Sequence, residues 1–153
     1  MDIQEFKDSL AELRMPMHSL VLLQLDAEGN DYLFLEYISK DGKYVASCSW
    51  AGRVYLYGCD QPSEPCVLLG TGRPAGVDRA PIRLGTLMQE ISSITSPTKV
   101  ILMPDHERPL LGVARDVFKI RGNSVEPYDD DSDYSEEDGD DEVAECVVLY
   151  PIN

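Results

Sequence analysis

The chain has 153 residues, of which 43% are hydrophobic, and it carries 28 acidic against 13 basic side chains, for a formal net charge of -15. This length and apolar fraction suffice for one compact domain with a hydrophobic core and are too small for two ordinary domains. The charge excludes a protein whose whole surface binds nucleic acid or anionic lipid, because phosphate binding depends on clustered Lys and Arg.

The N-terminal third predicts one helix and then four strands. Apolar side chains recur at three- and four-residue intervals over residues 2 to 15, which predicts an amphipathic helix with Asp2 at its N-cap. Short runs rich in Leu, Val and Tyr follow, separated by Glu-Gly-Asn, Lys-Asp-Gly and Trp-Ala-Gly turn signals. We expect these runs to form an antiparallel meander of residues 18 to 26, 31 to 39, 43 to 49 and 53 to 59.

The middle of the chain predicts a long irregular stretch and a second helix. Prolines and glycines break regular structure over residues 60 to 83, apart from the brief apolar run from Cys66 to Leu69. A stripe of Leu, Met and Ile side chains then predicts an amphipathic helix over about residues 82 to 95. Strand-like runs return at residues 98 to 103, 110 to 121 and 143 to 150.

The negative charge is concentrated in one acidic segment, residues 126 to 145. This segment holds 12 acidic residues and no Lys or Arg, whereas residues 1 to 125 hold 16 acids and 13 bases. It lies between the last two predicted strands, so we expect a flexible internal loop extended by self-repulsion. The predicted fold class is therefore α+β: a single domain over residues 1 to 153 with a mainly antiparallel sheet, two amphipathic helices and this long acidic loop.

Partner binding is the first function that the acidic segment suggests. A basic protein surface fits it, for example that of a nucleic-acid-binding protein, because complementary charge speeds association and selects partners. Trp50, at a predicted hairpin tip, is a second candidate contact. The expected partner-binding acids are Asp129, Asp130, Asp131, Asp133, Glu136, Glu137, Asp138, Asp140, Asp141 and Glu142.

Other interpretations of the acidic segment remain open. A solvating loop that keeps the protein in solution has the same composition. Specific calcium binding has an incomplete signature, since Tyr134 stands where an EF-hand-like register needs its first oxygen ligand. Ser135, followed by three acidic residues, is a site that an acidophilic kinase could phosphorylate.

The alternative function is an enzyme or ligand-binding domain with an anion site. Arg73, Arg79 and Arg83 lie in the Gly70 to Arg83 stretch, which would come near His106. These arginines could bind an anion or pair with the acidic segment within the same molecule. Asp105 and Glu107 beside His106 supply too few ligands for a metal site, so neither a metal nor a cofactor is predicted.

The remaining features point to an intracellular protein without a recognisable reaction. The four cysteines form no disulfide framework, and the N-terminal sequence lacks the charged and apolar regions of a signal peptide. No membrane span and no direct nucleic-acid contact are expected, and no catalytic residues are assigned. The sequence thus predicts a small acidic cytoplasmic protein of inhibitor, immunity or accessory type, such as a nucleic-acid mimic from a phage or virus.

Overall fold

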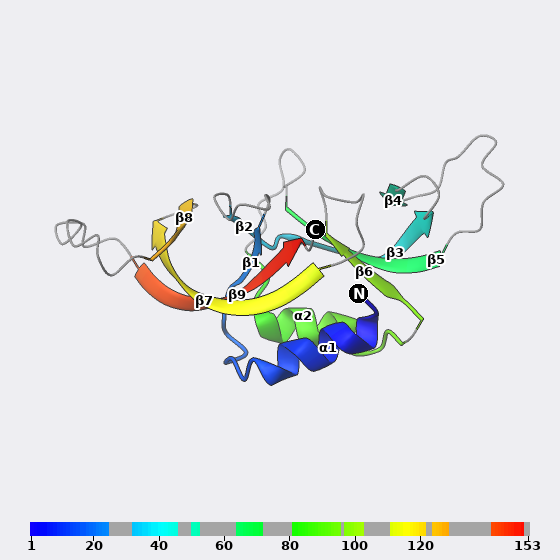
Figure 1. Ribbon diagram of the computed structural model, residues 1–153, viewed down its shortest axis with the longest axis horizontal. Coiled ribbons are helices and arrows are strands. Elements are labelled where there is room, and N and C mark those ends of the chain that lie inside the picture. Colours follow the sequence, from blue (N-terminus) through cyan, green and yellow to red (C-terminus); the bar gives the residue numbers. More distant parts are fainter. Residues whose placement is uncertain are drawn as a thin grey trace.

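The structure is a computed structural model. It describes residues 1–24, 32–45, 50–52, 64–71, 81–95, 97–102, 111–121, 124–128 and 142–151, and residues 44, 45, 50–52 and 151 by their backbone alone. Within these residues the chain is an α+β protein with two helices and two mixed β-sheets. Both helices lie on the same side of the two sheets (Figure 1).

The two sheets contain strands from distant parts of the chain. The five-stranded sheet has the order β2-β1-β9-β7-β8 and the four-stranded sheet the order β4-β3-β5-β6. The helices are α1 (Ile3–Glu12) and α2 (Leu84–Ile91). The strands of the first sheet are β1 (Val21–Gln24), β2 (Tyr32–Phe34), β7 (Leu111–Arg121), β8 (Ser124–Pro127) and β9 (Glu142–Pro151). Those of the second are β3 (Tyr37–Val45), β4 (Trp50–Gly52), β5 (Glu64–Gly70) and β6 (Lys99–Leu102).

Helix α1 follows from its cap and its apolar spacing. Asp2 is the N-cap, and its Oδ2 accepts a hydrogen bond of 2.9 Å from the backbone N–H of Gln4. Ile3, Phe6 and Leu10 are fully buried or nearly so, as the three- and four-residue spacing requires. The helix ends at Glu12, before the expected stop at Pro16, because Arg14 takes a left-handed conformation with φ of 52°.

Two large groups of buried side chains hold the sheets in place. The main core lies between the helices and both sheets, and it joins residues of α1 and α2 to residues of β1, β5, β6, β7 and β9. The second core lies on the opposite face of the five-stranded sheet and contains Leu22, Phe34, Phe118, Ile120 and Val125. The edge strands β2 and β8 contact each other, so this sheet curls around the second core (Figure 1).

The expected meander is wrong, because consecutive strands separate into different sheets. β1 and β2 form an antiparallel hairpin, but β3 pairs with β4 and β5 in the other sheet. Each sheet also contains a parallel pair, β1 with β9 and β5 with β6. Successive residues are buried where these strands pair, so both of their faces are covered there, which explains their continuous apolar sequences. The predicted strand at 53 to 59 lies outside the described residues.

Two local predictions also differ from the structure. The Lys-Asp-Gly signal at residues 40 to 42 lies inside β3, where the register with β5 shifts between Ser39 and Gly42. An irregularity of this kind absorbs the turn-forming residues without ending the strand. The stretch expected to be irregular contains the seven-residue β5, which occupies an inner position of its sheet.

Candidate functional site

Most of the predicted site residues lie outside the described residues. This applies to the acids from Asp129 to Asp141 and to Arg73, Arg79 and His106. Glu142 is described as the first residue of β9, and Arg83 as the residue before α2. Trp50 begins β4, and only its backbone is described. The candidate site is therefore built from the strands and loops that border the acidic segment.

Both ends of the acidic segment are strand residues at the outer end of the five-stranded sheet. Glu126 and Pro127 belong to β8, and residues 142 to 145 belong to β9. Both strands pair antiparallel with β7, on its two sides. The first end is fixed by a 2.9 Å hydrogen bond from the Tyr128 N–H to the carbonyl of Val117. The two ends of the acidic segment therefore lie on strands that flank β7 (Figure 1).

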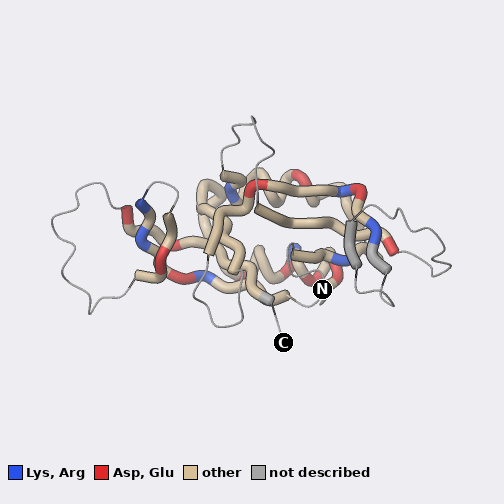
Figure 2. Tube along the Cα trace, turned by 90° about the horizontal axis from the view of Figure 1, so that it is seen from above, with Lys and Arg blue, Asp and Glu red and all other residues tan. Residues whose placement is uncertain are grey.

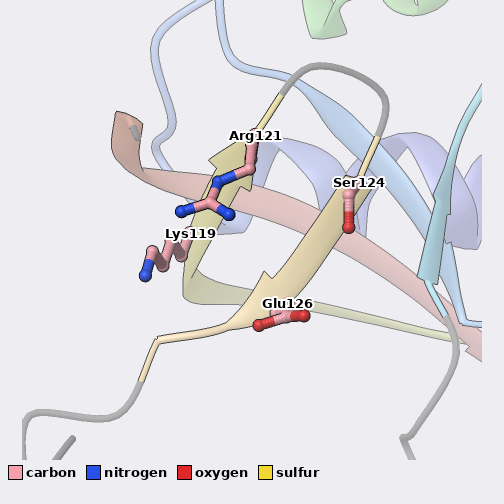
Figure 3. A pocket seen from close by; sticks show the side chains of 4 residues that line it. All are labelled: Lys119, Arg121, Ser124 and Glu126. Carbon is pink, nitrogen blue, oxygen red and sulfur yellow. The ribbon is translucent and has the colours of Figure 1, made fainter. Parts of the chain in front are cut away.

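A pocket of about 310 Å³ lies on the β7–β8 hairpin. Lys119 and Arg121 from β7 and Ser124 and Glu126 from β8 line it (Figure 3). Lys119 stands opposite Glu126 in the register, and Arg121 stands opposite Ser124. Basic and acidic residues therefore both occur at this end of the molecule (Figure 2). Because cross-strand neighbours of opposite charge attract, the pocket has no single sign of charge.

A second pocket brings together one residue from each of the two predicted sites. Arg83 and Glu142 both line this space of about 230 Å³, together with His18 and Glu145. Its remaining lining is mostly apolar, from Met15, Pro16, Ser19, Leu20 and Ala144. The sequence offered two roles for the arginines, and a pocket with two carboxylates favours pairing within the molecule over capture of an anion.

Arg83 is held in place by the start of α2. Arg83 is the N-cap but makes no capping bond with its side chain, because guanidinium has no acceptor. The connection between α1 and β1 supplies the missing acceptors: the Leu84 N–H donates to the Ser19 carbonyl at 2.9 Å and the Gly85 N–H to that of Met17 at 2.8 Å. The Arg83 guanidinium donates to the carbonyl of His18 at 2.7 Å. Arg83 therefore has a structural partner.

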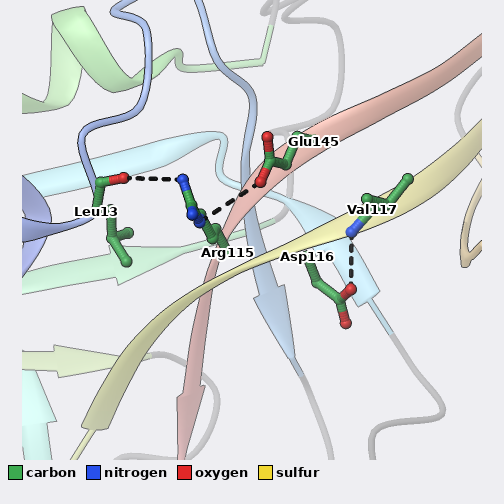
Figure 4. Close-up of polar contacts among 5 residues, drawn as sticks. All are labelled: Leu13, Arg115, Asp116, Val117 and Glu145. Carbon is green, nitrogen blue, oxygen red and sulfur yellow. Dashed lines mark hydrogen bonds and ion pairs between the residues drawn. The ribbon is translucent and has the colours of Figure 1, made fainter.

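A polar contact joins the sheet to the end of α1. Arg115 of β7 lies 3.5 Å from a carboxylate oxygen of Glu145 on β9, and its Nη1 donates to the Leu13 carbonyl at 3.4 Å (Figure 4). On the same strand, Asp116 accepts the backbone N–H of Val117 at 2.8 Å. Both Arg115 and Glu145 are about half exposed, so water screens this ion pair and it adds little stability. The contact marks where α1 stops covering the sheet.

Over the described ranges, no group of three or more His, Cys, Asp or Glu side chains could hold a metal ion. In the same part of the chain, no helix has the length and apolar character needed to cross a membrane.

The two cysteines that the structure describes are free thiols in the protein interior. Cys66 and Cys146 are fully buried, and burial raises the pKa of each thiol from 9.0 to about 11. In a Cys48→Ser, Cys59→Ser variant we expect neither remaining thiol to react with a disulfide reagent at neutral pH until guanidinium unfolds the protein. Because both pKa values are raised, their contribution to stability is complete below pH 9 and is lost as the pH rises toward 11. Rapid labelling of the folded variant would contradict this prediction.

Comparison with protein-family models, curated proteins and solved structures gives no match. The fold and the arrangement around the acidic segment are therefore the basis for a functional proposal. The class that they define is an α+β protein with a strongly acidic connection between two strands of one sheet.

Proposed function

We propose that this chain is a non-catalytic binding protein that engages a basic macromolecular surface through its acidic segment. The observation that carries the proposal is the distribution of charge: 12 of the 28 acids lie in residues 126 to 145, while residues 1 to 125 are nearly balanced, with 16 acids and 13 bases. A field of one sign that comes from one segment attracts cationic partners toward that segment. We infer an inhibitor, immunity or accessory role in the cytoplasm.

The position of the acidic segment supports the proposal. Its two ends are anchored on strands on either side of β7, in a ladder whose inner part belongs to the main core. Substitutions of charged residues between those strands can therefore change which partner binds and leave the core unchanged. A surface that imitates a run of phosphates fits this arrangement, and a nucleic-acid-binding protein is the kind of partner whose Lys and Arg would recognise it.

The anion-site alternative has less support. Arg83 is the residue of that site that the structure describes, and its guanidinium is bonded to the His18 carbonyl beside two carboxylates. An anion entering this pocket would have to approach Glu142 and Glu145. No observation on the described residues favours it over pairing within the molecule.

Capture experiments at two salt concentrations test the proposed function. The immobilised protein should retain basic proteins from the native cell at low salt and release them at high salt, because screening shortens the range of charge interactions from about 10 Å at 0.1 M to about 3 Å at 1 M. Changing the ten acids from Asp129 to Glu142 into Asn or Gln should abolish capture. This variant keeps the chain length and the β9 strand, and its thermal unfolding should show that it remains folded.

Two controls separate the acidic segment from net charge in general. A variant with the same residues from 129 to 141 in shuffled order should capture the same proteins, since the proposal depends on charge density. Neutralising the exposed Glu5, Asp8 and Glu12 of α1 should reduce capture less than neutralising Asp129, Asp130 and Asp131. If the neutralised segment captures the same proteins with the same dependence on salt, the proposed function is wrong.

A further inference from the structure

Three apolar side chains share one face at the outer end of the five-stranded sheet. Lys119 stands opposite Val143 on β9 and opposite Glu126 on β8, and Val117 stands opposite Glu145. Residues that face each other across a ladder project to the same side, and alternate residues along a strand share a side. The N–H of Tyr128 donates to the Val117 carbonyl, which places Tyr128 beside Val117. We call Val117, Tyr128 and Val143 the open face.

Neither the second core nor, at this end, the helices cover the open face. The second core takes the opposite side of the same strands, where Phe118 and Ile120 are buried. The main core covers the same side further along β9, where Val147 and Leu149 are fully buried. Val143, two positions before Glu145 on that side, is 50% exposed, and Tyr128 is 42% exposed. The cover provided by the helices therefore ends between Val143 and Val147.

Charged residues of both signs surround the open face. Arg115 pairs with Glu145 at 3.5 Å, and Lys119 faces Glu126 across the hairpin. The pocket that Lys119, Arg121, Ser124 and Glu126 line adjoins this face (Figure 3). An apolar centre inside a polar rim is the usual arrangement of a protein–protein interface. Because Arg115 and Lys119 each lie beside a carboxylate, most of the rim charge is offset locally, and binding over this face depends on apolar contact.

The acidic segment determines what reaches the open face. Ten of its twelve acids lie between Tyr128 and Val143, from Asp129 to Glu142. A cationic partner attracted by ten acids would thus be held beside these side chains, and a second contact then forms at a high effective concentration. Charge complementarity selects a cationic partner, and the apolar side chains favour one that carries apolar groups among its Lys and Arg.

We propose that the open face is the docking surface for apolar side chains of the basic partner that the acidic segment attracts. This inference rests on the proposed function and adds a contact that charge alone does not provide. The acidic segment supplies long-range attraction, and Tyr128 and Val143 supply the selection between cationic surfaces of equal charge.

Two fluorescent peptides with equal numbers of lysines test the proposal. They differ at some of the remaining positions, where one peptide has serine and the other has leucine. The wild-type protein should bind the leucine peptide more tightly. A Tyr128→Ser, Val143→Thr variant should lose about tenfold in affinity for the leucine peptide and nothing for the serine peptide, as expected for the loss of two apolar contacts. A matched control, Met17→Ser with Leu33→Thr, changes two exposed apolar side chains elsewhere and should leave both affinities unchanged.

Methyl spectra of the wild-type protein provide a measurement that no variant can confound. Addition of the leucine peptide should shift the resonances of Val117 and Val143 and leave those of the buried Val100 in place. Equal affinity of the wild-type protein for both peptides, or an unchanged affinity in the open-face variant, would overturn the docking surface while binding to the acidic segment stands.

Other outcomes point to different explanations. If neither peptide binds, or if the neutralised segment binds both as tightly as the wild type does, the proposed function fails, and the docking surface fails with it. Sedimentation of the wild type as a dimer that the Tyr128→Ser, Val143→Thr variant dissociates would show that a second copy of the chain covers the open face. That result would also overturn the proposed partner.

Discussion

Replacing Phe118 by alanine is expected to lower the free energy of unfolding by about 3 to 5 kcal/mol, the usual cost of emptying a large buried aromatic site. Phe118 is fully buried in the second core. Its ring meets that of Tyr32 edge to face, with centroids 4.9 Å apart and an interplanar angle of 67°. Because Tyr32 lies on β2 and Phe118 on β7, this contact connects strands that are far apart in the order of the sheet. Urea denaturation monitored by circular dichroism measures the change.

The neighbouring Val117→Ala variant is the matched control for Phe118. Val117 lies on the same strand but projects to the other face and is only partly buried. Its replacement should change stability by at most about 1 kcal/mol, the span of strand propensities at partly exposed sites. A Phe118→Ala variant no less stable than the Val117→Ala variant would show that the second core contributes little to folding.

Replacing Gly42 by alanine is expected to lower the free energy of unfolding by about 1 to 3 kcal/mol, because the added methyl group overpacks the space between β3 and β5. Gly42 faces Cys66 in the register, and a Cβ at this position would lie 2.8 Å from the Cys66 sulfur and 2.9 Å from its carbonyl oxygen. The carbonyl belongs to an inner strand and cannot move away without disturbing the ladder. Thermal unfolding of the variant measures the loss of stability.

Gly112→Ala is the comparison for Gly42→Ala, since it also adds one methyl group to a strand glycine. A Cβ at Gly112 would overlap the far end of the Tyr150 ring, which faces Gly112 on β9. A side chain can turn away at lower cost than a backbone carbonyl, so Gly112→Ala should be less destabilising than Gly42→Ala. A larger loss of stability in Gly112→Ala than in Gly42→Ala would mean that the Tyr150 ring is fixed more firmly than the ladder between β3 and β5.

Local sequence patterns predicted where the helices and strands of this fold lie better than they predicted which strands pair with each other. The three- and four-residue spacing of Ile3, Phe6 and Leu10 indicates a helix, and these residues are the ones that α1 buries. The Leu- and Val-rich runs likewise coincide with β1, β7 and β9. Strand pairing depends on contacts between distant residues. The parallel pairing of Val21 with Val147 has no local signal, so two mixed sheets were mistaken for one meander.

The candidate site was harder to predict, for two different physical reasons. The Gly122-Asn123 dipeptide lies between β7 and β8, and a pair of this type is a hairpin signal that could have revealed β8. The open face had no such signal. Val143 precedes a run of buried residues and has the same side-chain chemistry as Val147, but only its position beyond the end of α1 leaves it exposed. That position depends on the packing of the whole molecule.

The two ends of the acidic segment are closer together than the length of that segment requires. They flank the single strand β7, so the gap across the sheet is about 10 Å, or about 15 Å with the offset along the strands. Four or five extended residues would span it at about 3.5 Å each, whereas the chain places 13 residues, 129 to 141, between Tyr128 and Glu142. Connectivity of the fold therefore does not account for the length of this segment. Its length and composition can therefore change while the two sheets stay the same, as a segment that recognises the proposed partner would require.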